Sequence, residues 1–138
     1  LLTQLEVQIA SRGHTMDIVE MNLRFLAKSR RSKTYGCRPY PCIVSYIIPD
    51  YVNCGFFGAN ELGIHLYTFE KEYFTSYSWD NLIFDHTVIY DNNQSITHIQ
   101  FEEFAMGEMF ILQVVDVLIA GSILRLCNHF SMRNRRSR

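Results

Sequence analysis

Residues 62–104 read LGIHLYTFEKEYFTSYSWDNLIFDHTVIYDNNQSITHIQFEEF, and this stretch decides the fold class. It consists of runs rich in aromatic and β-branched residues, separated by short polar groups, which is typical of strands and turns. No helical pattern separates these runs, so we expect the strands to pair as an antiparallel meander. The predicted strands are 62–69, 73–79, 82–90 and 96–104, and the predicted turns are 70–72, 80–81 and 91–94.

Toward the N-terminus, the same period of two continues. Residues 4–9 and 19–25 alternate polar and apolar side chains, which predicts two half-buried strands joined by a hairpin loop. A helix capped at Thr15 or Asp17 is the alternative for the second of them.

The next segment is a continuous apolar run. Residues 42–48 predict a strand covered on both faces. Residues 49–61 contain Pro49, Gly55 and Gly58, and we therefore predict turns there.

The C-terminal part changes character. Met106 to Ile119 is nearly all apolar and predicts a helix that is buried on most sides and stops at Gly121. The valines in this run also permit a strand. A membrane span is disfavoured, because the run is short and contains Asp116. We expect one domain over residues 1–130 and a flexible basic tail over 131–138.

The resulting prediction is a mainly β fold, an antiparallel barrel of six to seven strands closed by one C-terminal helix. Residues 62–67 place a glycine at the start of an apolar strand, and residues 77–82 form an aromatic and acidic turn into the next strand. With this order of elements, the chain resembles small bacterial members of the pleckstrin-homology-like superfamily. The resemblance implies two roughly orthogonal sheets, with the helix plugging one open end. Lipid-binding members carry several Lys or Arg residues in the first hairpin, where this chain has only Arg12 and His14. Lipid headgroup binding of that kind is therefore not expected.

A fainter similarity connects the chain with small plasmid-borne PrgU-like proteins of Gram-positive bacteria. It rests on length, strand order and an early basic loop, and it implies RNA binding.

The net charge of −1 hides an uneven partition. Residues 1–40 carry seven Lys or Arg against three acids, residues 41–110 carry one lysine against ten acids, and residues 111–138 carry five arginines against one aspartate. Opposite charge in different parts of one chain favours self-association of basic and acidic surfaces.

The basic loop at 29–41 contains the best candidate residues for binding a polyanion or a partner. Cations neutralise phosphates, and aromatic rings stack on unpaired bases. The primary set is Arg30, Arg31, Lys33, Tyr35, Arg38 and Tyr40. The secondary basic set is Arg133, Arg135, Arg136 and Arg138. A solvated loop and a solubilising tail are the alternative interpretations.

Catalytic and metal motifs are missing from the sequence. It contains no GxSxG, HExxH, GxxxxGK[ST] or GxGxxG pattern, so we expect neither an enzyme nor a cofactor. His86 and His98 flank a predicted turn and are weak zinc candidates, together with Asp85 or His65, but we expect no metal. Tyr73, Tyr77 and Trp79 are predicted to be core residues. The cysteines include no CxxC pair, so we expect reduced structural thiols and a cytoplasmic location. They are Cys37, Cys42, Cys54 and Cys127.

These features together predict a non-enzymatic binding or regulatory module that acts through protein–protein contacts, self-association included. A small RNA-binding regulator that uses the 29–41 loop is the alternative. Peripheral membrane attachment through the apolar C-terminal segment and its arginine tail is the second alternative.

Overall fold

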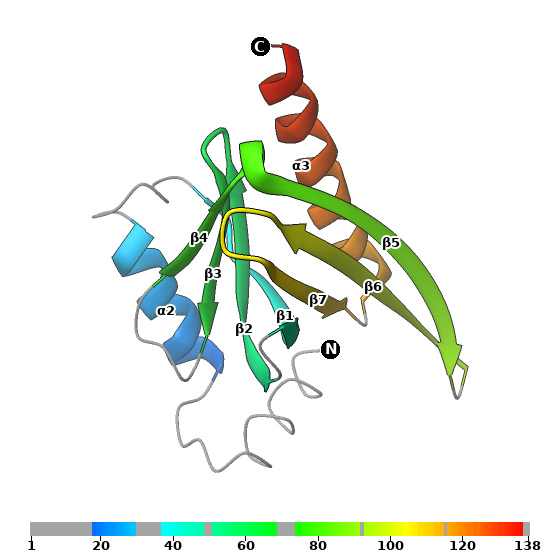
Figure 1. Cartoon of the computed structure of the whole chain (residues 1–138). Helices are drawn as coiled ribbons and strands as arrows, with labels where there is room; N and C mark the ends of the chain where they lie inside the picture. The colour runs from blue at the N-terminus through cyan, green and yellow to red at the C-terminus, as the bar shows by residue number, and fades with distance from the viewer. Residues whose placement is uncertain are drawn as a thin grey trace.

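The computed structural model describes residues 18–29, 37–48, 51–68, 74–91, 93–114 and 116–136. In these residues the strands form one antiparallel seven-stranded sheet in the order β4-β3-β2-β1-β7-β6-β5 (Figure 1). The prediction of a mainly β fold with seven antiparallel strands and a C-terminal helix is confirmed at this level. In chain order the elements are α2 (Ile18–Ser29), β1 (Tyr40–Ile48), β2 (Tyr51–Asn60), β3 (Gly63–Thr68), β4 (Phe74–Ser78), the 3-10 helix η1 (Trp79–Asn81), β5 (Leu82–Asp91), β6 (Gln94–Glu103), β7 (Glu108–Val114) and α3 (Val117–Arg136).

The two edge strands of this sheet, β4 and β5, are consecutive in the chain. Only the three residues of η1 separate them, so the two edges meet at one corner and the sheet must curl strongly. Beyond that corner β5 follows β6 over its full length and leaves β4 behind (Figure 1). The described strands therefore form a curled but open sheet, and not the closed barrel that the sequence predicted.

The main core lies on the concave face of the sheet, under α3. Aromatic rings fill its centre, and the rings of Phe101 and Phe110 stack with their centroids 5.1 Å apart. Helix α3 contributes Ile123 and other buried side chains, and its Phe130 stacks on Trp79 of η1 at 6.5 Å. Burying each such side chain contributes about 1.5–3 kcal/mol. The core prediction for Tyr77 and Trp79 is confirmed, since both are 5% exposed, and Tyr73 lies outside the described residues.

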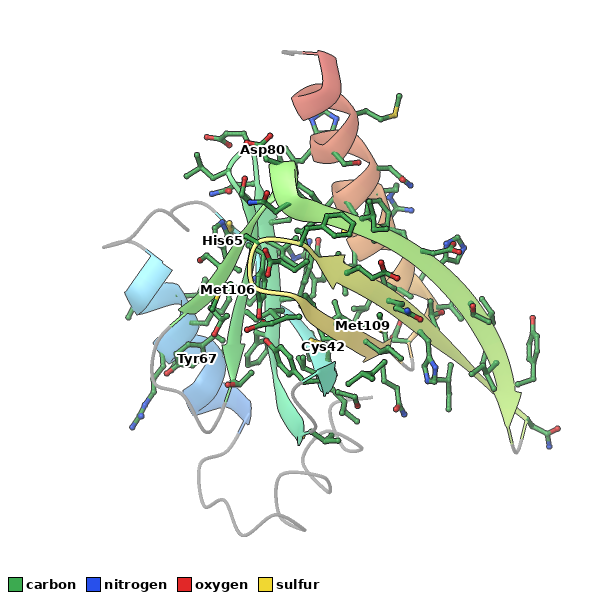
Figure 2. All side chains as sticks on the ribbon, viewed as in Figure 1. Cys42, His65, Tyr67, Asp80, Met106 and Met109 are labelled. Atoms are coloured by element: carbon green, nitrogen blue, oxygen red, sulfur yellow. The ribbon has the colours of Figure 1, made fainter. Side chains whose placement is uncertain are left out.

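The opposite face of β2 and β3 is covered by α2. Phe25 is fully buried and makes edge-on ring contacts with Phe56 at 6.1 Å and with Tyr67 at 6.4 Å. Figure 2 shows Tyr67 beside this helix. The predicted strand at 19–25 is thus wrong, because the alternation there coincides with a one-sided helix that leaves Leu23 exposed.

Residues 49–61 were predicted as turns, and this is also wrong, because most of them form β2. The glycines are required by close packing within the strand. A Cβ on Gly55 would lie 2.2 Å from the carbonyl oxygen of Tyr67, and one on Gly58 would lie 3.0 Å from side-chain atoms of both Cys37 and Phe25. Glycine in a strand commonly marks such an approach.

The apolar run from Met106 to Ile119 is divided between a strand and a helix, so the predicted helix over the whole run is wrong. Its first part is β7, and α3 begins after Asp116. The Asp116 carboxylate accepts hydrogen bonds from the amides of Leu118 at 2.8 Å and Ile119 at 3.1 Å, which is a helix N-cap. Gly121 lies inside α3 instead of ending it, and residues 131–136 of the predicted tail belong to this helix.

Candidate functional site

The predicted basic loop is only partly described. Arg30, Arg31, Lys33 and Tyr35 lie outside the described residues. Arg38 is exposed, and its guanidinium carbon lies 5.4 Å from the ring centroid of Tyr40, a cation–π contact at the start of β1. Polyanion binding by this loop stays a prediction.

The predicted arginine tail falls mostly at the end of α3. The backbone of Arg133, Arg135 and Arg136 is helical, and Arg138 lies outside the described residues. Of the helices in the described ranges, none is both long and apolar enough to cross a membrane.

The two weak zinc candidates lie on opposite faces of the sheet. Thr87 pairs with His98 and His86 pairs with Ile99, and paired residues share a face. His86 therefore faces the concave side and His98 the convex side, so the two imidazoles cannot bind one ion. The described residues contain no group of three or more His, Cys, Asp or Glu side chains arranged to hold a metal.

A buried polar network joins β2, β3 and β4. His65 is 1% exposed; its Nε2 lies 2.9 Å from Asn60 Oδ1 and its Nδ1 lies 2.7 Å from Ser76 Oγ. Asn60 Oδ1 also accepts from the Leu62 amide at 3.0 Å, which identifies it as the amide oxygen. His65 Nε2–H is therefore the donor, and Nδ1 accepts from the Ser76 hydroxyl.

The order Ser76, His65, Asn60 resembles a nucleophile, a base and an orienting amide. A base in such a triad must also return its proton to the leaving group, which requires contact with the substrate. The imidazole of His65 is too deeply buried to make that contact. The network is better explained as a set of hydrogen bonds that fixes the turn between β2 and β3. The indole N–H of Trp79 adds to it by donating to the backbone carbonyl of Asn60 at 2.7 Å.

A second polar group bridges β4 to β1 and β7 across the concave face. The Tyr46 and Tyr77 hydroxyls lie 2.9 Å apart, and the Tyr77 hydroxyl donates to Glu108 Oε2. Burial and the hydrogen bonds to Glu108 and Tyr46 raise the pKa of Tyr77 far above its ordinary value, so Tyr77 remains a donor. The curled sheet is thus held together by side chains where no strand pairing closes it.

The free edge of β5 pairs with no other described strand. This edge strand is ten residues long and pairs with β6 throughout without a bulge. Every residue from Asp85 to Tyr90 is exposed, with Tyr90 at 80%, and Ile83, Val88 and Ile89 are between 41% and 47% exposed. The strand contains no Lys and no Pro, which commonly protect an edge from pairing, and its acidic residues are Asp85 and Asp91.

The direction of the backbone groups on this edge follows from one contact. The amide of His86 donates to Asp85 Oδ1 at 2.8 Å, so this N–H points away from β6. Because N–H and C=O groups alternate in direction along an antiparallel strand, Phe84, Val88 and Tyr90 also present theirs to the free side. The free edge of β5 is therefore a row of backbone N–H donors and C=O acceptors with which a further strand can pair.

The position of β5 at the edge of the sheet was not predicted from the sequence. Its strand character was recognised, but its place at an edge depends on β1 pairing with β7, a contact between distant segments. The lack of Lys and Pro in the strand was the available signal.

A scan against protein-family models finds no match for this sequence, and a search of the curated proteins finds no similar protein.

Proposed function

We propose that this chain is a protein-binding module whose binding site is the free edge of β5. A partner adds an extended segment to this edge as a further antiparallel strand, by main-chain hydrogen bonds. The observation that carries the proposal is the ten-residue, bulge-free edge with exposed apolar side chains. An exposed edge strand of this kind is a template on which another chain can pair.

Side-chain chemistry supports binding more than catalysis. The polar groups of the two side-chain networks, His65 and Tyr77, are buried and hold the strands together. The exposed apolar side chains on β5 instead offer alternate positions that a bound strand can cover, which is how edge-binding domains gain specificity.

We also infer that the fold is an open variant of the pleckstrin-homology-like barrel. The support is the single curled sheet of seven antiparallel strands, the corner at η1 and the helix α3 on the concave face. In this interpretation the opening between β4 and β5 is what leaves the β5 edge free.

A single substitution tests the binding site. Val88→Pro removes an outward N–H but none of the bonds to β6, because proline is tolerated where the N–H of an edge strand faces solvent. Val88→Thr keeps the N–H and is the matched control. The immobilised proteins are offered a phage-displayed library of random nine-residue peptides.

We expect the wild-type chain and Val88→Thr to enrich peptides with apolar residues at alternate positions, and Val88→Pro to enrich none of them. Enrichment of the same peptides by all three proteins would place the binding site elsewhere. Failure of the wild-type chain to enrich any peptide would contradict the proposed function.

A further inference from the structure

We infer that the strand accepted by β5 is β5 of a second copy, paired antiparallel about a two-fold axis at His86. This inference rests on the proposed function and names its partner. The two sheets then continue into one another through their β5 strands.

The sequence of β5 is symmetric in polarity about His86. Residues 82–90 read LIFDHTVIY, three apolar residues, three polar residues and three apolar residues. A two-fold axis at His86 places Leu82 opposite Tyr90, Ile83 opposite Ile89, Phe84 opposite Val88 and Asp85 opposite Thr87. Every directly opposed pair then matches apolar with apolar or polar with polar, and such cross-strand pairs are the unit of sheet stabilisation.

The direction of the free backbone groups agrees with this pairing. His86 presents its N–H to the free side, so His86 and its copy form a hydrogen-bonded pair at the axis. The backbone groups of Phe84 and Val88 also face the free side. Phe84 therefore exchanges backbone hydrogen bonds with Val88 of the second copy, and Val88 does so with Phe84 of the second copy. Opposed residues also share a face, so the concave faces of the two sheets lie on one side.

Neighbouring alignments fit less well. An axis at Thr87 places Asp85 opposite Ile89 and Ile83 opposite Asp91, which pairs each acid with an apolar side chain. An axis at Val88 places Asp85 opposite Asp91, and like charges directly opposite one another are destabilising. The axis at His86 is therefore the alignment that this sequence favours.

Asp85 limits the strength of the contact. In the single copy its carboxylate accepts the amide of His86, which is the donor needed at the axis. This bond must be released in both copies on pairing, so Asp85→Ala should tighten the dimer about a hundredfold, which is about tenfold for each of two hydrogen bonds to a charged group. One ten-residue strand is also smaller than a standard interface of roughly 20–30 residues a side, so we expect a dissociation constant on the order of 10 µM or weaker.

Cysteine cross-linking of the full chain tests the axis. His86→Cys places two thiols opposite one another with Cα atoms about 5.5 Å apart, within the range of a disulfide. Thr87→Cys is the matched control, because in this alignment its two copies are diagonal neighbours about 7–8 Å apart, which a disulfide does not span. The native cysteines are all buried and do not compete.

Under oxidation by diamide, we expect His86→Cys to form a covalent dimer and Thr87→Cys to stay monomeric. Analytical ultracentrifugation of the wild-type chain should show a dimer that forms with rising concentration, that is tighter in Asp85→Ala and that is lost in Val88→Pro. Cross-linking of Thr87→Cys but not His86→Cys would overturn the axis. A wild-type chain that is monomeric at all concentrations would overturn the dimer, and if it still selects peptides through β5 the proposed function survives that result.

Discussion

Removing the hydroxyl of Tyr77 tests whether side chains close the curled sheet. In Tyr77→Phe the ring keeps its stacking on Phe110, whose centroid lies 5.1 Å away, so only polar contacts are lost. The bond to the Glu108 carboxylate is worth about 1.5–3 kcal/mol and the bond to the Tyr46 hydroxyl about 0.5–1.5 kcal/mol. Glu108 is half-buried and regains some water, so we expect the free energy of unfolding to fall by about 2 kcal/mol.

Urea denaturation measures this loss as a lower midpoint at an unchanged slope. Tyr46→Phe is the comparison, because it removes the bond between the two tyrosines and keeps the bond from Tyr77 to Glu108, so it should cost less, about 1 kcal/mol. If Tyr77→Phe unfolds within about 0.5 kcal/mol of the wild-type chain, like an ordinary surface substitution, the bridge between β4 and β7 does not stabilise the fold.

Three further substitutions or conditions have defined outcomes. Phe25→Ala removes the side chain that holds α2 on β2 and β3, and should lower the unfolding free energy by about 3–5 kcal/mol in urea denaturation; a loss below about 1 kcal/mol would mean that α2 does not pack as described. Ser76→Ala leaves Nδ1 of the buried His65 without its donor and should cost about 1–3 kcal/mol in thermal unfolding, whereas an unchanged midpoint would show that the network is unimportant. Burial raises the pKa of Cys37, with a contribution from Glu61, from 9.0 to about 11, and burial raises that of Cys127 from 9.0 to about 12. As the pH rises, the thiols of the unfolded chain lose their protons before those of the folded chain, which stabilises the unfolded state. The free energy of unfolding measured in urea should therefore fall above about pH 9, and a constant value up to pH 11 would contradict the burial of these thiols.

Strands with uninterrupted local patterns could be predicted from the sequence, and segments with competing patterns could not. The strands around Ile64, Phe84 and Ile99 were recognised because aromatic and β-branched residues fill them between clear turns. The β2 strand was missed because Gly55 and Gly58 look like turn residues, and only the packing against Tyr67 and Phe25 explains them.

The ends of the chain show how one pattern fits two structures. Seven residues that alternate in polarity at 19–25 also place Phe25 on one helix face, and the tertiary contact with Phe56 decides for the helix. In the sequence Asp116 fits both a polar position within an apolar helix and the N-cap before a helix, and the structure shows the N-cap. The predicted number of strands thus agrees with the structure, although the predicted strand at 19–25 is a helix and the predicted strand at 4–9 lies outside the described residues.

The candidate site illustrates the same limit. The polarity of residues 82–90 is visible in the sequence, but it acquires meaning only when β5 is known to be an edge strand. The predicted binding residues are basic and aromatic side chains of the 29–41 loop, whereas β5 has no basic Lys or Arg, so the pattern that indicates polyanion binding does not indicate this edge.

Residue-resolved amide hydrogen exchange tests the β5 edge most directly. The amides of Thr87 and Ile89 bond to β6, so their exchange should be slow at every protein concentration. The amides of Phe84 and Val88 have the same direction as that of His86 and face the free edge, so they should exchange rapidly in dilute protein and become protected as the concentration rises. If Phe84 and Val88 exchange equally fast at all concentrations, the edge does not pair with a second copy.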